Sequence, residues 1–577
     1  MILSTIDWVI IGSYFTLSII VGLWASKRAG KDTRSFFLAG RSMPWWLLGV
    51  SMVATTFSTD TPNLVTDLVR QNGVSGNWAW WAFLLTGMLT VFVYARLWRR
   101  SGVLTDIEFY ELRYSGKPAA FLRGFRAIYL GLVFNILVMG TVSLAAVKFG
   151  EIVLRLPGWV TLLTACSITL AYSTLGGLKA VIITDFIQFT LAMIGSIWGM
   201  IYILDLPEIG GLSNLLNHEN VKGKLALIPD MSDPNLWVPV LLVPLAVQWW
   251  ASYYPGAEPG GGGYIAQRMF SAKDESNAVS ATLLFNVTHY ALRPWPWIII
   301  ALSSLIIFPD LKDIQFAFPN LPADKLGHDV AYPAMLTRLP SGLLGLVSAS
   351  LIAAFMSTMS TQLNLGASYL VNDFYHRFIK PDASEKHLVT VGRLFTILSI
   401  ILGGGLGLLL TSAGQAFTLV LMIGTGTGLI YILRWFWWRI NAYTEIVAMI
   451  SSLFIAGYFN FGNSGFEEWQ KIVVGALLTT VIWISATYFT PPENDQTLRN
   501  FVKKIKPGGP GWAKYSDGIL SEEWPVPKGI LSMFLGCTAV YGILFGVGQL
   551  IYGHNLPGLL IFIISIISSI GLIKIWK

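Results

Sequence analysis

The stretch Leu351–Asn364, LIAAFMSTMSTQLN, decides the class of fold, because it places four hydroxyl side chains in an otherwise apolar segment. On a helix Ser357, Ser360 and Thr361 share one face, whereas Thr358 lies about 100° around the axis. A single serine or threonine in a membrane helix usually returns its hydroxyl to its own helix. A cluster instead predicts oxygen ligands for a small hard cation, and neutral oxygens suit a weakly held monovalent ion.

The composition places this segment in a lipid bilayer. Of 577 residues 54% are hydrophobic and 12% are charged, whereas soluble domains are about 25% charged. Apolar stretches of the roughly 20 residues needed to span a bilayer recur along the chain. We therefore expect an all-α polytopic membrane protein. About fifteen spans are expected, beginning near Ile6, Pro44, Gly76, Arg123, Pro157, Ala180, Leu236, Ala278, Leu336, Leu388, Gly414, Ala442, Gln470, Gly529 and Leu556.

The distribution of basic residues predicts the orientation. Lys27 and Arg28 follow the first span rather than precede it, which is opposite to a cleavable signal peptide. Alternate loops then collect positive charge, as cytoplasmic loops do. The basic residues of these loops include Arg96, Arg99, Arg100, Arg113, Arg268, Lys273, Arg377, Lys380, Arg434, Arg439, Lys503 and Lys504. We expect a cell-membrane protein with its N-terminus outside and its C-terminus in the cytoplasm. The net charge of +7 therefore requires no nucleic acid partner.

Two of the expected spans are interrupted by residues that break helices. The second span contains MVATTFSTDTPNLV and the seventh contains QWWASYYPGAEPGGGG. Irregular backbone at membrane depth persists only where it is buried in protein or lines an aqueous cavity. A proline kink would explain one break. Two breaks five spans apart favour two inverted five-helix repeats that each open with a discontinuous helix.

A carboxylate lies within the sixth span, in AYSTLGGLKAVIITDFIQF. Carboxylates inside membranes are costly and are functional-site hypotheses by default. Asp185 is therefore a candidate cation ligand. The alternative is an interfacial aspartate that pairs with Lys179.

Four motifs in order resemble the sodium:solute symporters, from the first span to about Arg439. They are SFFLAGRSMPWWLLGVSMVATTFS, LTDIEFYELRY, STLGGLKAVIITDFIQ and LIAAFMSTMSTQLNLGASYLVNDFY. The resemblance implies a leucine-transporter-like fold whose inverted repeats cover residues 44–204 and 236–438. Residues 1–43, 442–490 and 529–577 would be peripheral, and residues 491–528 would form a cytoplasmic linker.

The resemblance also implies two sodium sites. The main site would consist of the backbone carbonyls of Ala54, Phe57 and Ala354 with the hydroxyls of Ser357 and Thr358. The second site would consist of Asp185, Ser357, Ser360 and Thr361. Some members that use one sodium ion have alanine in place of Ser360, so this sequence resembles a coupler of two sodium ions.

The candidate solute site lies next to the two breaks. Its candidate residues are Asp60, Thr61, Trp80, Gln248, Tyr254, His289 and Arg293. Aromatic faces and hydrogen-bonding groups favour a sugar or sugar-like solute. An organic acid or amino acid held by Arg293 is the alternative. Either His289 or Arg293 could take the place of a substrate-contacting lysine of sugar symporters, and this choice stays open.

The expected activity is sodium-coupled symport by a functional monomer. A membrane sensor built on the same scaffold is the alternative from another class. No Gly-x-Ser-x-Gly elbow, paired Cys and His or zinc-ligand spacing is present in the sequence, so we do not expect an enzyme.

Overall fold

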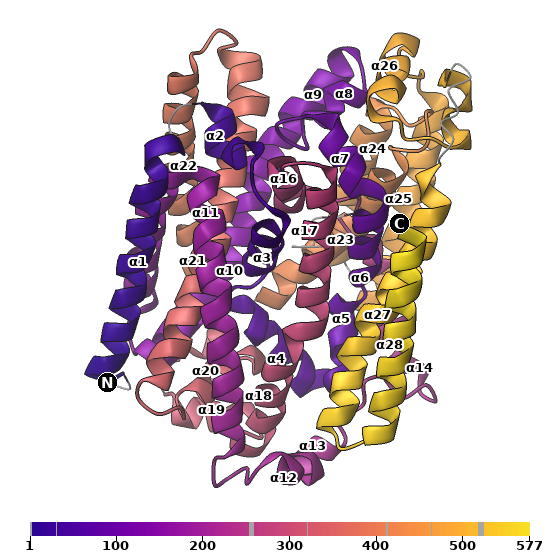
Figure 1. Ribbon diagram of the computed structural model, residues 1–577. Coiled ribbons are helices and arrows are strands. Elements are labelled where there is room, and N and C mark those ends of the chain that lie inside the picture. Colours follow the sequence, from indigo (N-terminus) through magenta and orange to yellow (C-terminus); the bar gives the residue numbers. More distant parts are fainter. Residues whose placement is uncertain are drawn as a thin grey trace.

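The computed structural model describes residues 3–29, 32–252, 259–319, 321–410, 413–462, 464–516 and 524–576. Within these ranges the chain is helical and forms no β-strand. The helices form a bundle in which most of the long helices are roughly parallel or antiparallel to one another (Figure 1).

The first region begins at the N-terminus and ends with a long element that is kinked at Gly177. Its α-helices are α1 (Thr5–Ala29), α2 (Thr33–Leu38), α3 (Trp45–Thr55), α4 (Asp60–Asn72), α5 (Trp78–Trp81), α6 (Leu84–Leu89), α7 (Ala95–Ser101), α8 (Phe109–Arg113), α9 (Gly116–Ile128), α10 (Asn135–Phe149) and α11 (Gly158–Leu204). Inside α11, Gly177 has φ 57°, a conformation that suits glycine, and it divides the element into the fifth and sixth expected spans.

The second region contains the hydroxyl-bearing helix. Its α-helices are α12 (Leu212–Asn217), α13 (Glu219–Lys222), α14 (Pro234–Trp237), α15 (Val243–Ala246), α16 (Gly263–Ser271), α17 (Glu275–Val287), α18 (Pro294–Ile307), α19 (Leu311–Ala317), α20 (Ala331–Leu336), α21 (Leu343–Ser368), α22 (Glu385–Leu409) and α23 (Ala413–Leu433). The last region consists of α24 (Ala442–Phe461), α25 (Glu468–Phe489), α26 (Asp495–Ile505), α27 (Pro525–Ile551) and α28 (Asn555–Trp576).

Helix length and composition confirm the all-helical membrane class. Among the described residues, ten helices are long and apolar enough to cross a membrane. Shorter apolar helices occupy Thr5–Val21, Trp45–Thr55, Gly158–Ala171, Pro234–Ala246 and Gly424–Leu433. These positions follow the expected spans in order. The count of fifteen spans and the inverted symmetry stay predictions.

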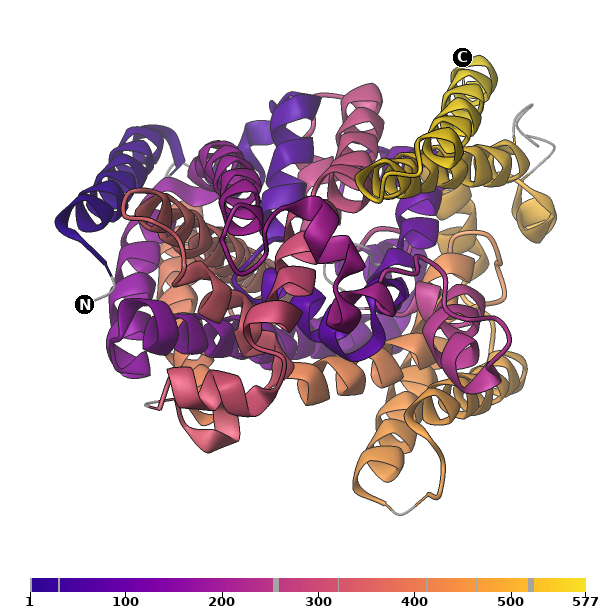
Figure 2. The same ribbon diagram turned by 90° about the horizontal axis from the view of Figure 1, so that it is seen from below.

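Short helices gather at the two ends of the bundle. The N-terminus, α12, α13 and α19 lie at one end, and α8, α9 and α26 lie at the other (Figure 1). Seen from below, α1 and the pair formed by α27 and α28 lie on opposite sides of the rim (Figure 2). Their place at the rim agrees with the expected peripheral segments, whose role stays a prediction, as does the end of the bundle that faces the cytoplasm.

Helix α21, which carries the four hydroxyls, lies at the centre of the packing. It packs against α1, α3, α10, α11, α16 and α22, and Ser357, Thr358, Ser360 and Thr361 are all buried. The hydroxyls therefore face protein rather than lipid, as a ligand cluster requires.

The N-terminal helix is attached to α21 through one buried carboxylate. Oδ1 of Asp7 accepts the backbone N–H groups of Gly342 and Gly345, each at 2.7 Å. The first N–H groups of a helix have no partner within it, and a carboxylate there also meets the positive end of the helix dipole. Asp7 on α1 thus caps α21 in trans.

Asp7→Ala is expected to lower the free energy of unfolding by about 2 kcal/mol, because it removes charge-assisted hydrogen bonds from buried N–H groups. Unfolding of the purified protein in mixed micelles measures this change. Asp205→Ala, an exposed aspartate at the C-terminal end of α11, is the matched control and should change the value by less than about 0.5 kcal/mol. Equal stability of the Asp7 variant and this control would contradict the capping role.

The segment expected to be a cytoplasmic linker contains a packed helix. Leu498, Phe501 and Ile505 on α26 are buried, and Nε1 of Trp512 donates to the carbonyl of Trp435 at 2.8 Å. The described part of residues 491–528 therefore covers the end of the bundle near α7 and α8. The sequence is short and polar overall, but its apolar residues recur at helical spacing.

Candidate ion and solute site

The first break separates α3 from α4. α3 ends at Thr55 and α4 begins at Asp60, with a non-helical turn between them. Pro62 lies in the first turn of α4, where the missing N–H removes no helical hydrogen bond. The backbone carbonyls of this turn are thereby left to bind groups outside the helix.

The second break separates α15 from α16. The described part of this span ends in a 3₁₀ turn, Gln248–Trp250, and α16 begins at Gly263. Tyr254 lies outside the described residues. α23 approaches the segment closely, since a Cβ added at Gly428 would clash with the carbonyl oxygen of Trp250. Both expected interruptions therefore occur as interruptions of helical structure.

Thr358 joins the hydroxyl-bearing helix to the first break. Its hydroxyl donates to the carbonyl oxygen of Thr55 at 2.9 Å and lies 3.4 Å from that of Phe57. The Ala54 carbonyl accepts the N–H of Phe57 at 3.2 Å. Ala354 is buried on α21. The structure therefore brings Thr358 and the expected Phe57 carbonyl together, and it adds the Thr55 carbonyl, which sequence reasoning missed.

A second cluster surrounds Asp185, which is fully buried. The hydroxyl of Ser357 donates to Oδ1 of Asp185 at 2.6 Å, and that of Ser51 donates to Oδ2. Thr361 Oγ1 lies 3.2 Å from Thr55 Oγ1 in the same region. The structure therefore brings Asp185 and Ser357 together, on the hydroxyl face that the sequence predicts.

Two further residues that the sequence linked to this cluster, Ser360 and Lys179, make other contacts in the structure. Ser360 donates its hydroxyl to the carbonyl of Ser357 on its own helix at 3.0 Å. Lys179, the alternative partner of Asp185, instead places its ammonium 5.4 Å from the centroid of Trp24.

The cation beside Asp185 is an arginine. Arg268 belongs to α16 and is fully buried, so its expected place among exposed basic residues of an inside loop is wrong. Its Nη2 lies 3.6 Å from Oδ2 of Asp185 and 2.8 Å from Oγ1 of Thr361. The positions of basic residues in the sequence indicate which end of the bundle a residue is near, but they do not indicate whether its side chain points inward. The buried guanidinium points toward the Asp185 carboxylate, which offsets its charge.

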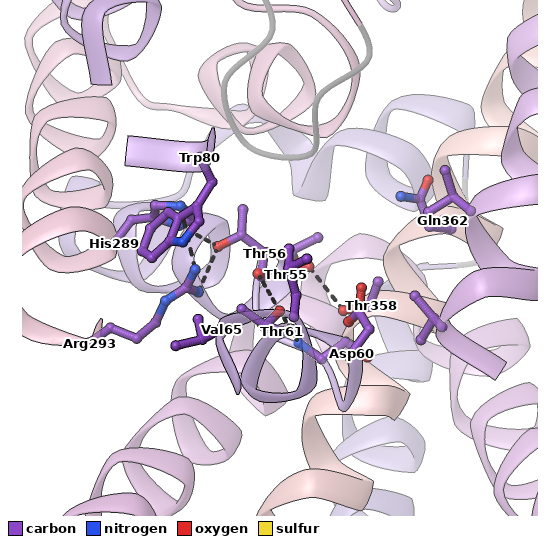
Figure 3. Close-up of a pocket in the computed structure, with 14 residues that line it drawn as sticks. Thr55, Thr56, Asp60, Thr61, Val65, Trp80, His289, Arg293, Thr358 and Gln362 are labelled. Carbon is purple, nitrogen blue, oxygen red and sulfur yellow. Dashed lines mark hydrogen bonds between the residues drawn. The ribbon is translucent and has the colours of Figure 1, made fainter. Parts of the chain in front are cut away.

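A cavity of about 100 Å³ lies beside the first break. Figure 3 shows Trp80, His289 and Arg293 on one side of it and Gln362 on the other, with Thr358 between them. The residues that line it are Thr55, Thr56, Ser58, Asp60, Thr61, Leu64, Val65, Trp80, Val138, Val142, His289, Arg293, Thr358 and Gln362. Five expected solute-site residues are thus brought together, and Gln362 is one that sequence reasoning missed.

Gln248 does not line this cavity. Its amide donates to the backbone carbonyl of Ala79 at 2.7 Å, directly before Trp80 in the chain. The structure therefore gives Gln248 a contact with the segment that carries Trp80 rather than a place on the cavity wall.

His289 and Arg293 both line the cavity, and which of them contacts the solute stays a prediction. Nη2 of Arg293 lies 3.4 Å from Nε2 of His289, and both side chains contact Oγ1 of Thr56 at 3.0–3.1 Å. His289 lies in the π-helical turn Thr288–Leu292. Such turns are frequent at functional sites, because the wider ring shifts a side chain out of the regular helical register.

The geometry is that of two broken helices around a buried oxygen cluster next to a cavity. A model of the sodium:solute symporter family matches residues 36–452, which is more than half of the chain, and the protein belongs to this family. It is 28% identical to the sodium/glucose cotransporter of Vibrio parahaemolyticus, over 85% of this chain and 92% of that one. It is 26% identical to the sodium/myo-inositol cotransporter 2 of Homo sapiens, over 78% and 69% of the two chains.

A solved structure shares the fold. A Na⁺-coupled sialic acid symporter, in a substrate-bound outward-open state, gives a TM-score of 0.65 at 20% identity, covering 85% of this chain and 99% of that chain. At this identity the likeness concerns the fold alone.

Proposed function

We propose that this protein is a sodium-coupled symporter that imports a sugar or sugar-like compound through a cell membrane by alternating access. The observation that carries the proposal is the position of Thr358. This residue lines the cavity and also donates to a carbonyl of the first break. An ion held there would fix the shape of the cavity wall, so ion occupancy and solute affinity are linked.

Linkage makes this coupling reciprocal. If sodium raises the affinity for the solute, the solute raises the affinity for sodium by the same factor. The membrane potential then adds about 2.3 kcal/mol per charge per 100 mV to uptake. We propose two sodium sites, the main one at the first break and α21, and the second at Asp185, Ser357, Ser360 and Thr361.

The architecture of this proposal is a pair of inverted five-helix repeats, residues 44–204 and 236–438, working as a monomer with the N-terminus outside and the C-terminus inside. It is supported by the two breaks, which open corresponding segments of the chain. The cavity volume of about 100 Å³ is smaller than the roughly 300–1,000 Å³ of typical small-molecule sites, so we expect the broken helices to separate when the solute enters.

A sugar is favoured by the composition of the cavity wall. Trp80 offers an aromatic face, and Thr56, Thr61, Asp60 and Gln362 offer hydrogen-bonding groups to hydroxyls. The relatives named above that carry glucose and myo-inositol point to the same class.

One observation favours an organic acid or amino acid as the second candidate. The Arg293 guanidinium lines the cavity, and a guanidinium forms charge-assisted hydrogen bonds with carboxylates. A solute that combines hydroxyls with a carboxylate would use both sets of groups.

Uptake into liposomes tests the proposal. The purified protein is reconstituted and offered labelled sugars, sugar acids, amino acids and carboxylates, with an inward sodium gradient or with potassium in its place. Sodium-dependent accumulation of a neutral sugar supports the first candidate. Accumulation of acids alone supports the second, and sodium binding without uptake of any solute would favour a sensor on this scaffold.

A further inference from the structure

Arg268 places a fixed positive charge inside the proposed second sodium site. Its Nη2 contacts Asp185 and Thr361, two of the four expected ligands, at 3.6 and 2.8 Å. Its Nε lies 3.2 Å from Oγ of Ser51, and Nη2 lies 3.3 Å from Oγ1 of Thr55. The guanidinium therefore uses oxygen atoms of two of the four expected ligands, Asp185 and Thr361.

Charge repulsion disfavours the use of these oxygens by both cations together. Asp185 and Arg268 are fully buried, and like charges repel strongly where water does not screen them. Asp185 is the carboxylate of this cluster and has one negative charge. A sodium ion on Asp185 would lie close to the guanidinium, whose Nη2 is 3.6 Å from Oδ2, and their repulsion in this buried position favours the release of one of the two.

We propose that Arg268 is a tethered cation that occupies the second sodium site when sodium is absent and leaves Asp185 and Thr361 when sodium binds. The inference rests on the proposed function, since it concerns how that site is filled. Sodium and the Arg268 guanidinium would then compete for the second site. The sodium affinity of this site depends on the free energy needed to displace the guanidinium.

Because Arg268 lies on α16, the exchange of its guanidinium for sodium would act on this helix. α16 begins directly after the second break and packs against α3 and α21. The neighbouring Gln267 binds the carbonyl of Phe37 at 3.1 Å and Oδ1 of Asn364 at 2.8 Å. Displacing the guanidinium therefore acts on the helix that follows the second break, so occupancy of the second site and the arrangement of this broken helix are linked.

The test is sodium binding to the full-length protein in detergent, measured with labelled sodium in a Thr358→Ala background that removes the main site. If the paired arrangement is populated about ten to one over the open one, Arg268→Gln should raise the apparent sodium affinity about tenfold. Arg268→Lys keeps the charge but has no fork to contact Asp185 and Thr361 together, so it should raise the affinity by a smaller factor. The lysine variant also serves if the glutamine variant does not fold.

Two controls make the outcomes distinct. Lys273→Gln removes one exposed charge just after α16 and should leave the affinity unchanged. Asp185→Asn should abolish the remaining binding. Unchanged or weaker sodium binding in both Arg268 variants would overturn the tethered-cation inference, even if the wild-type protein transports with sodium. A wild-type protein that neither binds sodium nor shows sodium-dependent uptake would instead reject the proposed function.

Discussion

Thr358→Ala is expected to lower the apparent sodium affinity of uptake by about 30- to 150-fold. A hydrogen-bonding group with a charged partner contributes about 2–3 kcal/mol to the free energy of the interaction. Each 1.4 kcal/mol changes a binding constant by a factor of about ten. The substitution removes the one hydroxyl that joins α21 to the carbonyls of Thr55 and Phe57. Both the ion ligand and the link between the ion and the cavity wall are lost.

Sodium titration of uptake in liposomes measures this effect. Thr358→Ser keeps the oxygen and should stay within about threefold of the wild-type affinity. Ser360→Ala tests the neighbouring position, where the hydroxyl binds its own helix. If the Ser360 hydroxyl of the wild-type protein stays on its own helix when sodium binds, the alanine variant should have a sodium affinity near the wild-type value. If this hydroxyl instead binds the second ion, the alanine variant should show a less steep sodium dependence. Normal uptake by Thr358→Ala at low sodium would show that the main site lies elsewhere.

Trp80→Ala is expected to raise the KM for a sugar by about 30-fold, with a smaller change in kcat. Buried tryptophans at the centre of binding sites contribute about 2 kcal/mol or more. Trp80 lies against the ring of Tyr290 with a centroid distance of 5.8 Å, and its Nε1 donates to Asn77 at 2.9 Å. Its ring is therefore held in place before a solute arrives, so little ordering is needed on binding.

The matched variants separate stacking from folding. Trp80→Phe keeps an aromatic face and should raise KM by about threefold or less. Trp46→Ala removes a tryptophan of α3 that is 43% exposed at the bundle surface and should not change KM. Equal loss of uptake in Trp80→Ala and Trp80→Phe, with sodium binding intact, would assign Trp80 to packing rather than to the solute.

Features that depend on chain periodicity could be predicted from the sequence. Spacing alone places Ser357, Ser360 and Thr361 on one helical face, and all three are buried together on α21. The breaks near Pro62 and at the glycine run were predictable as well, because they arise from local backbone chemistry. The contact of Ser357 with Asp185 required the family resemblance, since 172 residues separate them.

Features that depend on how helices rotate against one another could not be predicted. In the sequence, Arg268 is indistinguishable from the other basic residues near the ends of spans. Its side chain is buried because α16 packs against α3 and α21. The same holds for Gln362, which lies one residue past the hydroxyl face and reaches the cavity wall. The donor role of Thr358 toward Thr55 depends on where α3 unwinds, which sequence patterns fix only to within a few residues.

The capping of α21 by Asp7 makes α1 a reporter of motion at the site. Because the carboxylate holds the first N–H groups of α21, the two helices are joined at the end where α1 begins. A spin label or fluorophore on the exposed face of α1, paired with one on peripheral α28, would record displacements of the hydroxyl-bearing helix through the transport cycle. Such labels leave every residue of the cavity and of the ion sites unmodified.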